Sequence, residues 1–396
     1  MPDPDVWDVI VVGAGPAGSS AARVAAEAGA RVLLLDRARF PRYKTCGGGI
    51  TGFSLRAMPD AARAAFEAEI TEFGLSRRGR DRTMLHDDRP FLGMVQRADF
   101  DQLLVDEATA AGAVFRDGVA VRGLDEADGD VRVRLDDEVL RARVVVGADG
   151  SSGRTAGYVG VEFAGSDLGL EVEIEAPDHE WSRTALFDWG AGRGSYAWLF
   201  PKRGALTIGV IQRTGVPDAT RAYLELWLRQ LGLAGATRLR ESGHLTRWRS
   251  GRSPLRRGSV LVAGEAGGLL EPWTREGISF ALRSGVMAGT AAAAAARATD
   301  PGSRDAALDG YVAAVTRELV PQIRAGAAML GLLERAPGLL HRVLAHTSAG
   351  RRTFLALCRG SERIAALVDH PIVRAGAAVL RPFRPRRAHP RAGRGS

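Results

Sequence analysis

Three glycines, Gly13, Gly15 and Gly18, form the pattern in this sequence that most clearly predicts a chemistry. They lie between an apolar run and an alanine-rich stretch, and an acid, Asp36, ends the next apolar run. In a strand–helix–strand unit such glycines make a tight turn, let the backbone approach a pyrophosphate and allow close helix packing. The helix N-terminus then attracts the phosphates, and the acid can bind a ribose. We therefore predict a dinucleotide site formed by Gly13, Gly15, Ala17, Gly18 and Asp36.

Two later segments repeat the pattern of a buried strand that ends in a glycine-containing turn. Asp149 and Gly150 follow one apolar run, and Gly264, Glu265 and Gly277 lie in or after another, SVLVAGEAGGLLEPWTREGI. Three such turns around one nucleotide fold suit an elongated cofactor better than NAD. A second, independent glycine pattern for NADPH is missing from the sequence.

These three segments, in this order and spacing, resemble the flavoprotein superfamily of aromatic hydroxylases, halogenases and geranylgeranyl reductases. The resemblance implies that the first segment holds the ADP half of FAD. It also implies that Glu265, Gly277 and Ile278 hold the ribityl chain and the pyrimidine end of the flavin, although the superfamily usually has aspartate where Glu265 stands. Gly277 and Ile278 begin a predicted long helix, so their N–H groups would stabilise negative charge on reduced flavin.

Two further segments resemble geranylgeranyl reductases in particular. Residues 36–50, DRARFPRYKTCGGGI, are similar to the F-P-R-x-K-x-C-G-G-G loop of that family, and residues 196–210, YAWLFPKRGALTIGV, are similar to its Y-x-W-x-F-P strand. That strand usually ends in glycine-any-glycine, whereas Ile211 stands here in place of the second glycine. The resemblance covers residues 6–290 and implies reduction of carbon–carbon double bonds in an isoprenoid chain by hydride transfer from reduced flavin.

The loop that contains Cys46 has a physical reason to lie against the flavin. Gly47 and Gly49 let the backbone pass close to the ring because no Cβ intervenes, so we include Cys46, Gly47 and Gly49 among the cofactor-binding residues. The Cys46 thiol either tunes the flavin, lines the substrate site or is inert. Because an isolated alkene accepts hydride poorly, a proton source is needed, and Tyr196, Lys44 or a bound water are the candidates. The predicted catalytic set is therefore Cys46, Tyr196 and Lys44.

Tyr196, Trp198 and Phe200 alternate along one predicted strand and therefore share a face. They form either an aromatic wall against an apolar substrate, which is our prediction, or part of an ordinary sheet core. Arg97 opens a predicted helix and matches the family arginine near the FAD phosphates and ribose. Val121, in a predicted strand, matches a position whose backbone meets the adenine.

The elements that must position these residues predict an α/β protein. We expect a Rossmann-like FAD-binding fold, discontinuous in sequence, with an inserted antiparallel-sheet substrate domain and a C-terminal helical region. Residues 55–70 look helical, and short alternating segments between 160 and 250 indicate strands. The expected order is FAD-binding pieces at 1–54, 96–160 and 255–304, substrate-domain pieces at 55–95 and 161–254, a helical region at 305–380 and a basic disordered tail at 381–396.

Composition and charge exclude several classes of protein. The 396 residues are 45% hydrophobic and 25% charged, as in globular proteins. The net charge of +8 falls to +2 without the last 16 residues, which hold six arginines and no acid, so we expect no nucleic-acid partner. Apolar stretches are shorter than a spanning helix requires, and two cysteines cannot form a disulfide framework. We therefore expect a cytoplasmic enzyme rather than a secreted, fibrous or integral-membrane protein.

Three functions remain open at this stage. The first is the isoprenoid reductase. The second is a flavin-dependent monooxygenase or, less favoured, a halogenase acting on an aromatic or polyketide substrate; the halogenase signature W-x-W-x-I-P is absent, and YAWLFP stands in its place. The third is a flavin-binding sensor or interaction protein without catalysis.

The partners follow from the favoured function. The electron donor is expected to be NADPH or a reduced partner protein that docks near the flavin, and the substrate an apolar prenyl chain. Long isoprenoids dissolve in lipid, and the helical end mixes leucine with arginine as interfacial helices do, so peripheral contact with a membrane is a further expectation. The histidines show no metal-ligand spacing, so no metal is expected.

Overall fold

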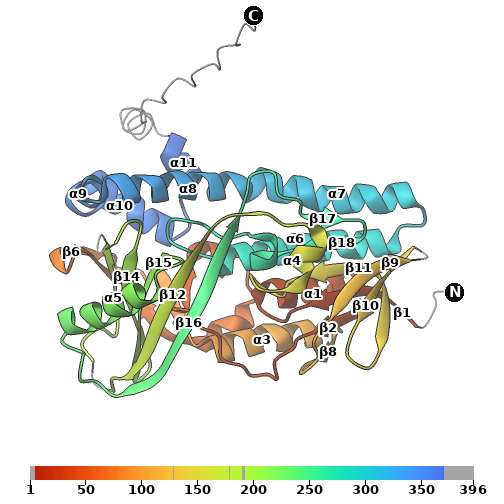
Figure 1. The fold of residues 1–396 in the computed structure, drawn as a ribbon, viewed down its shortest axis with the longest axis horizontal. Helices are drawn as coiled ribbons and strands as arrows, with labels where there is room; N and C mark the ends of the chain where they lie inside the picture. Colours follow the sequence, from red (N-terminus) through yellow and green to blue (C-terminus); the bar gives the residue numbers. More distant parts are fainter. Residues whose placement is uncertain (1–4, 128, 178, 190–191, 370–396) are drawn as a thin grey trace, which may run out of the picture.

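The computed structural model describes residues 5–127, 129–177, 179–189 and 192–369, and it contains two large sheets and a layer of C-terminal helices (Figure 1). The first sheet lies toward the N-terminus, and the second occupies the other end of the long axis. This arrangement confirms the predicted α/β class, with a discontinuous Rossmann-like fold, a second sheet and C-terminal helices. The basic tail predicted at 381–396, and the end of the predicted helical region, lie outside the described residues.

The first sheet is built from buried apolar strands. β1 (Val6–Val12) pairs in parallel with β2 (Val32–Leu35) on one side and β11 (Val139–Gly147) on the other. β8 (Val114–Arg116) and β18 (Val260–Val262) extend this parallel part, and every residue of β2 is buried, as is usual when helices cover both faces. The sheet is completed by β17 (Arg256–Arg257), β9 (Gly123–Ala127) and β10 (Asp130–Arg134).

Two alanine-rich helices, α1 (Pro16–Glu27) and α6 (Ile278–Arg297), pack against each other and against this sheet. Their contact is close because a Cβ on Gly285 or Gly289 would lie 2.2 or 2.3 Å from backbone oxygens of α1. By length and composition alone α6 could cross a membrane, but 67% of its most apolar window is buried inside the protein. The apolar character of α6 is thus used in the core.

The second large sheet has the strand order β16-β12-β15-β14-β13-β5-β6. Most neighbours are antiparallel, but β13 and β5 pair in parallel, so the sheet is mixed where the sequence predicted an antiparallel one. A parallel pair is possible here because β5 and β13 are far apart in the sequence, whereas strands joined by a tight turn must pair antiparallel. The bounds are β5 (Glu72–Arg77), β6 (Arg80–His86), β12 (Phe163–Glu175), β13 (Thr184–Trp189), β14 (Tyr196–Lys202), β15 (Ala205–Arg213) and β16 (Arg238–Arg249).

One face of the second sheet is covered by α5 (Pro217–Gln230), a helix that the sequence analysis missed. Its Tyr223, Leu224, Trp227 and Leu228 are buried against the sheet, at the i, i+1, i+4 and i+5 spacing of a helical face. The indole N–H of Trp227 also donates to a β14 carbonyl at 3.1 Å. The other face of the sheet is therefore the one available to a ligand.

A small third sheet begins at the last glycine of the CGGG loop (Cys46–Gly49). It consists of β3 (Gly49–Thr51), β7 (Leu92–Val95) and β4 (Phe66–Ile70), in that order. The predicted helix over 55–70 is wrong, because a short 3-10 helix (Asp60–Ala65) is followed directly by β4. The alanines there favour a helix locally, but pairing of β4 with β7 overrides that preference.

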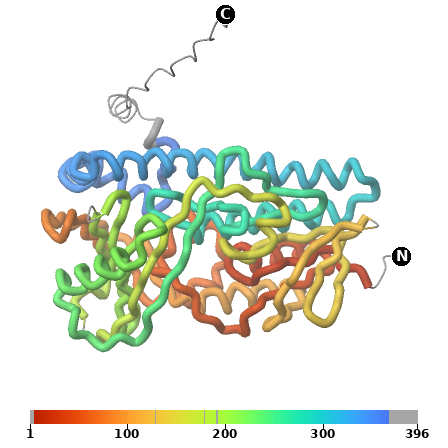
Figure 2. Tube along the Cα trace, viewed as in Figure 1, coloured from red at the N-terminus to blue at the C-terminus, as the bar shows by residue number. Residues whose placement is uncertain are grey.

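The C-terminal helices connect the two ends of the molecule. α7 (Pro301–Glu318) and α8 (Val320–Arg335) run along one side of it, and the later helices lie over the second sheet (Figure 2). Buried apolar residues of α8, α9 and α10 share one core with β5, β13 and β14. The remaining bounds are α2 (Gly52–Leu55), α3 (Arg97–Ala110), α4 (Arg154–Val159), α9 (Pro337–His346), α10 (Ser348–Cys358) and α11 (Ile364–Asp369).

Candidate active site

A cavity of about 970 Å³ extends from the glycine turn before α1 to the second sheet and α10. A volume of this size is at the upper end for ligand sites, as an extended dinucleotide together with a substrate requires. The cavity brings together all the predicted site residues except Gly18. Those that line it are Gly13, Gly15, Ala17, Asp36, Lys44, Cys46, Gly47, Gly49, Arg97, Val121, Tyr196, Trp198, Phe200, Glu265, Gly277 and Ile278.

The three glycines of the first turn have different surroundings. Gly13 has φ +100°, and a Cβ on Gly18 would lie 1.7 Å from the Gly13 carbonyl oxygen, so Gly18 serves packing beneath the turn. A Cβ on Gly15 would meet only the Arg42 guanidinium, at 3.5 Å, because this glycine faces the cavity. The Gly15 backbone is therefore open to a ligand.

Asp36 is fixed at the end of β2 by backbone amides. Its two carboxylate oxygens accept hydrogen bonds from the N–H groups of Ala14 and Ala38, each at 2.8 Å. Each oxygen keeps a lone pair that a ribose hydroxyl can use. Val121 lines the same end of the cavity, but it lies in the loop between β8 and β9 and not in a strand as predicted. The strand β8 ends at Arg116, and the chain that follows is tied to the end of β2 by the Val119 N–H, which donates to the Asp36 carbonyl at 2.8 Å.

Two guanidiniums near the first turn share a single buried carboxylate. Arg97 donates twice to Asp101, at 2.8 Å each, and Arg42 lies 2.9 Å from the same side chain. Burial disfavours the charged form of Arg97, but Asp101 more than offsets this and raises its pKa. Arg42 Nη1 is buried and has no hydrogen-bond partner among the described residues. The pair therefore carries net positive charge and a free donor beside the turn, which suits a phosphate. The sequence analysis had not selected Arg42.

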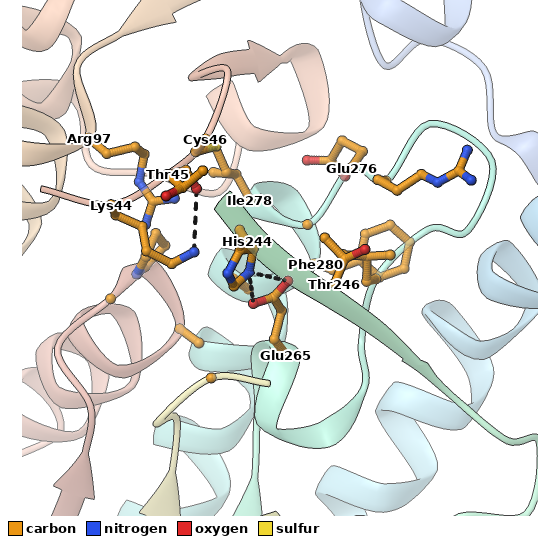
Figure 3. Close-up of a pocket in the computed structure, with 18 of the residues that line it drawn as sticks. Lys44, Thr45, Cys46, Arg97, His244, Thr246, Glu265, Glu276, Ile278 and Phe280 are labelled. Atoms are coloured by element: carbon orange, nitrogen blue, oxygen red, sulfur yellow. Dashed lines mark hydrogen bonds and ion pairs between the residues drawn. The ribbon is translucent and has the colours of Figure 1, made fainter. Parts of the chain in front are cut away.

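Glu265 faces a basic group from the second sheet (Figure 3). Its carboxylate lies 3.1 Å from Nε2 of His244 on β16, and Lys44 is a further charged neighbour. Burial opposes ionisation of Glu265, but the contact with His244, together with Lys44 and Arg97, lowers its pKa. Burial also lowers the pKa of Lys44, whose ammonium is 3.4 Å from the Thr45 carbonyl oxygen. The extra methylene of glutamate, where the superfamily usually has aspartate, is used to reach His244.

The CGGG loop is held by the second of the two lysines, Lys202. Its ammonium donates to the carbonyls of Gly47, at 2.8 Å, and of Val95, at 2.7 Å. Gly48, at φ +76°, allows this approach, since a Cβ there would be 2.4 Å from the lysine nitrogen. Burial lowers the pKa of Lys202 to about 8. The Cys46 sulfur accepts from the Gly48 N–H at 3.4 Å and also interacts with the Arg97 side chain, where both residues line the cavity.

The three predicted aromatic residues do line one face of the second sheet, and Phe187 joins them. The ring centroid of Phe187 is 5.0 Å from that of Tyr196 and 5.8 Å from that of Phe200. Trp198 lies flat on Gly209, where a Cβ would be 2.1 Å from its ring. The Tyr196 hydroxyl donates to the Thr274 carbonyl, and burial raises its pKa. Its proton is thus committed to a backbone acceptor.

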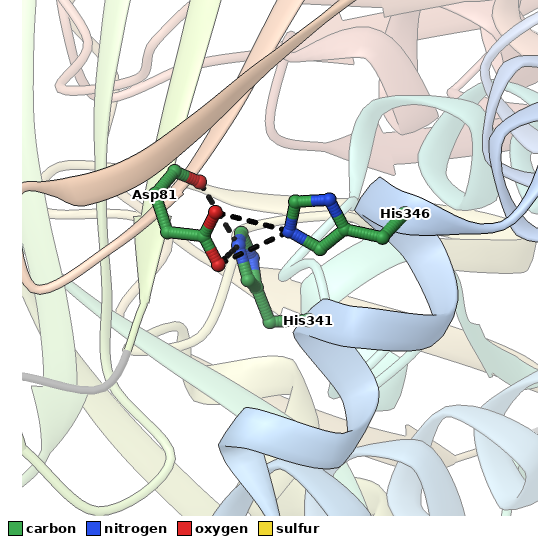
Figure 4. Close-up of side chains that lie close together, drawn as sticks. All are labelled: Asp81, His341 and His346. Atoms are coloured by element: carbon green, nitrogen blue, oxygen red, sulfur yellow. Dashed lines mark hydrogen bonds and ion pairs between the residues drawn. The ribbon is translucent and has the colours of Figure 1, made fainter.

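A second group of ionisable residues is not among those that line the cavity; Figure 4 shows how its side chains lie. Asp81, His341 and His346 have ligand atoms within 4.8 Å of one another, a grouping that their sequence spacing did not predict. The Trp189 indole N–H donates to Nδ1 of His341 at 3.2 Å, so a neutral His341 carries its proton on Nε2. That nitrogen is 3.1 Å from the Asp81 carbonyl oxygen, to which it donates. The group therefore links α9 to β6 through hydrogen bonds, in a tautomer unsuited to a metal.

The sequence of the whole chain has clear relatives. A sequence profile of the family described as "FAD binding domain" matches residues 6–317. A geranylgeranyl diphosphate reductase from Rhodobacter capsulatus is 31% identical over 325 residues, which cover 77% of this chain and 80% of that protein. The chain belongs to the geranylgeranyl reductase family of FAD-dependent oxidoreductases. Another relative, a digeranylgeranylglycerophospholipid reductase from Methanocaldococcus jannaschii, is 29% identical and covers 75% of this chain and 79% of its own.

Solved structures agree with this family at the level of the fold. A geranylgeranyl bacteriochlorophyll reductase-like protein from Thermoplasma acidophilum has a TM-score of 0.75 at 19% identity, over 92% of this chain and 99% of that one. The flavin-dependent brominase Bmp2 has a TM-score of 0.72 at 18% identity, over 94% and 99%. Because a reductase-like protein and a halogenase match almost equally well, the fold alone does not choose between their chemistries.

The residues present fit the FAD expected for the geranylgeranyl reductase family. The exposed Gly15 backbone and the free Arg42 donor suit the pyrophosphate, and Asp36 suits a ribose. Gly277 is the N-cap of α6, so the Ile278 end of that helix presents N–H groups to the cavity. These features all line one cavity.

Proposed function

We propose that this protein uses FAD to reduce carbon–carbon double bonds in the isoprenoid chain of a lipid, quinone or pigment precursor. The observation that carries the proposal is the aromatic wall of Phe187, Tyr196, Trp198 and Phe200, in which Trp198 and Phe200 lie against Gly47 of the CGGG loop. The same cavity is also lined by Phe354, Leu357 and Ile364 of the C-terminal helices. An apolar lining of this kind suits a prenyl chain better than a compact polar substrate. The names of the two curated relatives support the same substrate class.

Bound FAD, once reduced, would supply a hydride, that is, a hydrogen with its electron pair; the protein must place the alkene and exclude water. Trp198 and Phe187 provide flat apolar surfaces for the chain, and α10 closes the end of the cavity through Phe354. Lys202 holds the Gly47 carbonyl and so fixes the distance between the loop and the aromatic wall. We propose NADPH or a reduced protein as the electron donor, and peripheral contact with a membrane as the source of a lipid substrate.

An anaerobic turnover experiment tests this function. Purified holoprotein is reduced with dithionite and mixed, without oxygen, with a prenyl alcohol, a prenyl diphosphate or a menaquinone analogue. Flavin reoxidation with a product that has gained two hydrogens supports the reductase. Turnover that needs oxygen and adds an oxygen atom or a halogen would support the monooxygenase or halogenase that shares this fold. Absence of turnover in both cases leaves a non-catalytic flavoprotein.

A further inference from the structure

A buried acid that the sequence analysis did not select also lines the cavity. Glu171, on β12, is 2% exposed. One of its oxygens, Oε1, accepts from the Tyr43 hydroxyl and from the Cys46 N–H, each at 2.9 Å. The other oxygen, Oε2, is buried and has no hydrogen-bond partner among the described residues. A fully ionised carboxylate in this position would leave half of its charge unsolvated, which is costly.

The groups around Glu171 favour its neutral form. The hydrogen-bond donors that reach it, Tyr43, the Cys46 amide and more distantly Ser242, are all uncharged. Burial raises the pKa of Glu171, and Glu173 on the same strand adds to this, while those hydrogen bonds and the charge of Lys202 oppose it. The Lys202 ammonium is itself bonded to the Gly47 and Val95 carbonyls. Burial and the unpartnered Oε2 therefore both favour the protonated form of Glu171, with the proton on the oxygen that no described residue uses.

Glu171 stands in one row with the aromatic wall. Ser242, Glu171, Gly209, Trp198 and Phe187 are direct cross-strand neighbours on β16, β12, β15, β14 and β13. Directly opposed residues point to the same face of a sheet. Gly209 supplies no side chain between the acid and the indole, and Trp198 leans into that gap. The indole Nε1 of Trp198 is likewise buried without a partner among the described residues. Acid and aromatic ring thus flank the same part of the cavity.

We propose that Glu171 is the proton donor in alkene reduction, and that Tyr43 and Ser242 return a proton to it from solvent. In this step the Oε2–H bond of Glu171 breaks and a C–H bond forms at one alkene carbon. The other alkene carbon receives hydride from the reduced flavin, so that the double bond takes up one proton and one electron pair with its hydrogen. Glu171 is left as a carboxylate, and a solvent proton that passes through Tyr43 restores the acid.

The cross-strand neighbours of Glu171 can assist both the protonation of the alkene and the return of a proton to the acid. Protonation of a trisubstituted alkene at its less substituted carbon develops positive charge on the neighbouring carbon. The faces of Trp198 and Phe187 can stabilise such charge by cation–π attraction. On the other side of Glu171, the Tyr43 hydroxyl is 2.8 Å from Ser242, and both residues are only half-buried. The hydrogen-bonded chain therefore runs from the surface to the acid.

This inference rests on the proposed reductase function, and the first test measures both. Glu171→Gln keeps an acceptor for Tyr43 and the Cys46 amide but removes the proton. We expect FAD binding and reduction by dithionite to stay as in the wild type, and alkene-driven reoxidation without oxygen to slow by at least about 100-fold. Glu175→Gln, the same change at an exposed position of the same strand, should keep the wild-type rate. Equal rates for Glu171→Gln and the wild type would overturn the assignment while leaving the reductase function intact.

A second measurement does not depend on turnover. Infrared spectra of the holoprotein at neutral pH should contain the C=O stretching band of a protonated carboxylic acid. The part of this band that belongs to Glu171 should be lost in Glu171→Gln and kept in Glu175→Gln, whereas other buried acids, such as Glu271 and Glu276, contribute equally to all three spectra. If the wild type reduces no prenyl substrate but shows this part of the band, the proposed function fails and the buried neutral acid remains. If the band is the same in the wild type and in Glu171→Gln, Glu171 is ionised and cannot be the donor.

The role of Tyr43 is tested by comparing the rate of a single turnover with the rate of steady-state turnover. Tyr43→Phe leaves the Glu171 proton in place, so the single-turnover rate should stay within about threefold of the wild type. Steady-state turnover should fall by about tenfold, because reprotonation of Glu171 loses its donor. If the first turnover falls as far as in Glu171→Gln, Tyr43 acts on the state of the acid and not on its reloading, and the relay is wrong.

Discussion

Two glutamates face the same cavity from different surroundings, and their pKa values are shifted in opposite directions. Glu265 lies 3.1 Å from His244, with Lys44 and Arg97 nearby, and these positive or basic groups outweigh burial and lower its pKa. Glu171 receives hydrogen bonds from neutral donors, and burial raises its pKa. Because the two pKa values are shifted in opposite directions, Glu265 can act through its charge while Glu171 can act as a proton donor in the same site.

The difference follows from the parts of the fold that supply each side. The cofactor side is made of glycine turns, helix N-termini and guanidiniums, which are suited to an anionic ligand. The substrate side is a sheet face of aromatic residues with Glu171 among them, which is suited to an apolar ligand and a neutral acid. The CGGG loop lies between the two sides, and Lys202 fastens it to the second sheet.

The largest expected effect comes from removing the hydrogen bonds by which Lys202 holds the CGGG loop. Lys202→Met removes a donor from two buried carbonyls, Gly47 and Val95, and hydrogen bonds from a charged group stabilise by about 1.5–3 kcal/mol each. After allowance for the cost of burying the ammonium, we expect a loss of about 3 kcal/mol in the free energy of unfolding, measured with denaturant. Arg203→Met, at the exposed neighbouring position, should change it by less than about 0.5 kcal/mol. A stable Lys202→Met variant would show that the loop is held by other contacts.

The next effect concerns the cofactor side alone. In Gly15→Ala the new Cβ would meet only Arg42, at 3.5 Å, so the protein should fold. The methyl group would occupy the place where a pyrophosphate approaches the backbone, and we expect FAD affinity to fall by about 30-fold, or about 2 kcal/mol. Titration of apoprotein with FAD, followed by flavin fluorescence, measures this. Gly157→Ala, at an open and exposed position in α4, serves as the control and should bind FAD normally.

The contrast between the two glutamates gives a smaller effect with a defined sign. Glu265→Gln should lower thermal stability at neutral pH by about 1–2 kcal/mol, since the half-buried Lys44 and His244 lose a charged partner. The folded pKa of Glu265 is lowered, so its contribution is present above the unfolded pKa, about 4.3, and is lost as pH falls through the folded value. The difference in thermal stability between Glu265→Gln and the wild type should therefore become smaller as the pH is lowered.

Glu171→Gln should behave in the opposite way. Because the folded pKa of Glu171 is raised, the folded state holds a proton that the unfolded chain has released, and stability falls as pH rises through that window. The variant lacks this proton, so the difference between its melting temperature and that of the wild type should shift in favour of the variant as the pH is raised above the unfolded pKa, about 4.3. Parallel pH profiles for Glu171→Gln and Glu265→Gln would contradict the comparison.

The sequence predicted features that depend on local pattern. The turn at Gly13, the loop at Cys46 and the alternating aromatics from Tyr196 are short motifs, and residues of each line the cavity. The helix α5 was missed although its apolar spacing was readable. Val121 was placed in a strand because the few residues of β8 give no signal for where the sheet ends.

The contacts that the sequence could not predict join residues far apart in the chain. Glu171 and Tyr43 are separated by 128 positions, and Lys202 and Gly47 by 155. In LGLEVEIEA the glutamates alternate with apolar residues, which indicates a solvent-facing side for all of them. Glu171 is buried where Tyr43 and the Cys46 amide reach it from a distant segment of the chain, while Glu175, at the end of β12, stays exposed.

The Asp81–His341–His346 group extends the comparison to a buried ionisable residue outside the cavity and gives the smallest effect. His341 is 1% exposed, and burial lowers its pKa below the usual value of about 6.5. The unfolded chain then binds a proton that the folded protein does not, so stability should fall as pH drops below about 6.5, by up to about 1 kcal/mol. His341→Gln should lose this dependence, whereas His86→Gln, at an exposed histidine, should keep it.

Zinc provides the opposing outcome for the same three residues. A metal bound to His341 through Nε2 would require the proton to move to Nδ1, where the Trp189 indole already donates. Equimolar zinc should therefore leave the melting temperature of the wild type unchanged. A rise that disappears in His346→Gln would show that the indole contact yields to a metal and that this group is a site. Without such a rise, Nε2 of His341 keeps the proton that it donates to the Asp81 carbonyl, and the group serves to join α9 to β6.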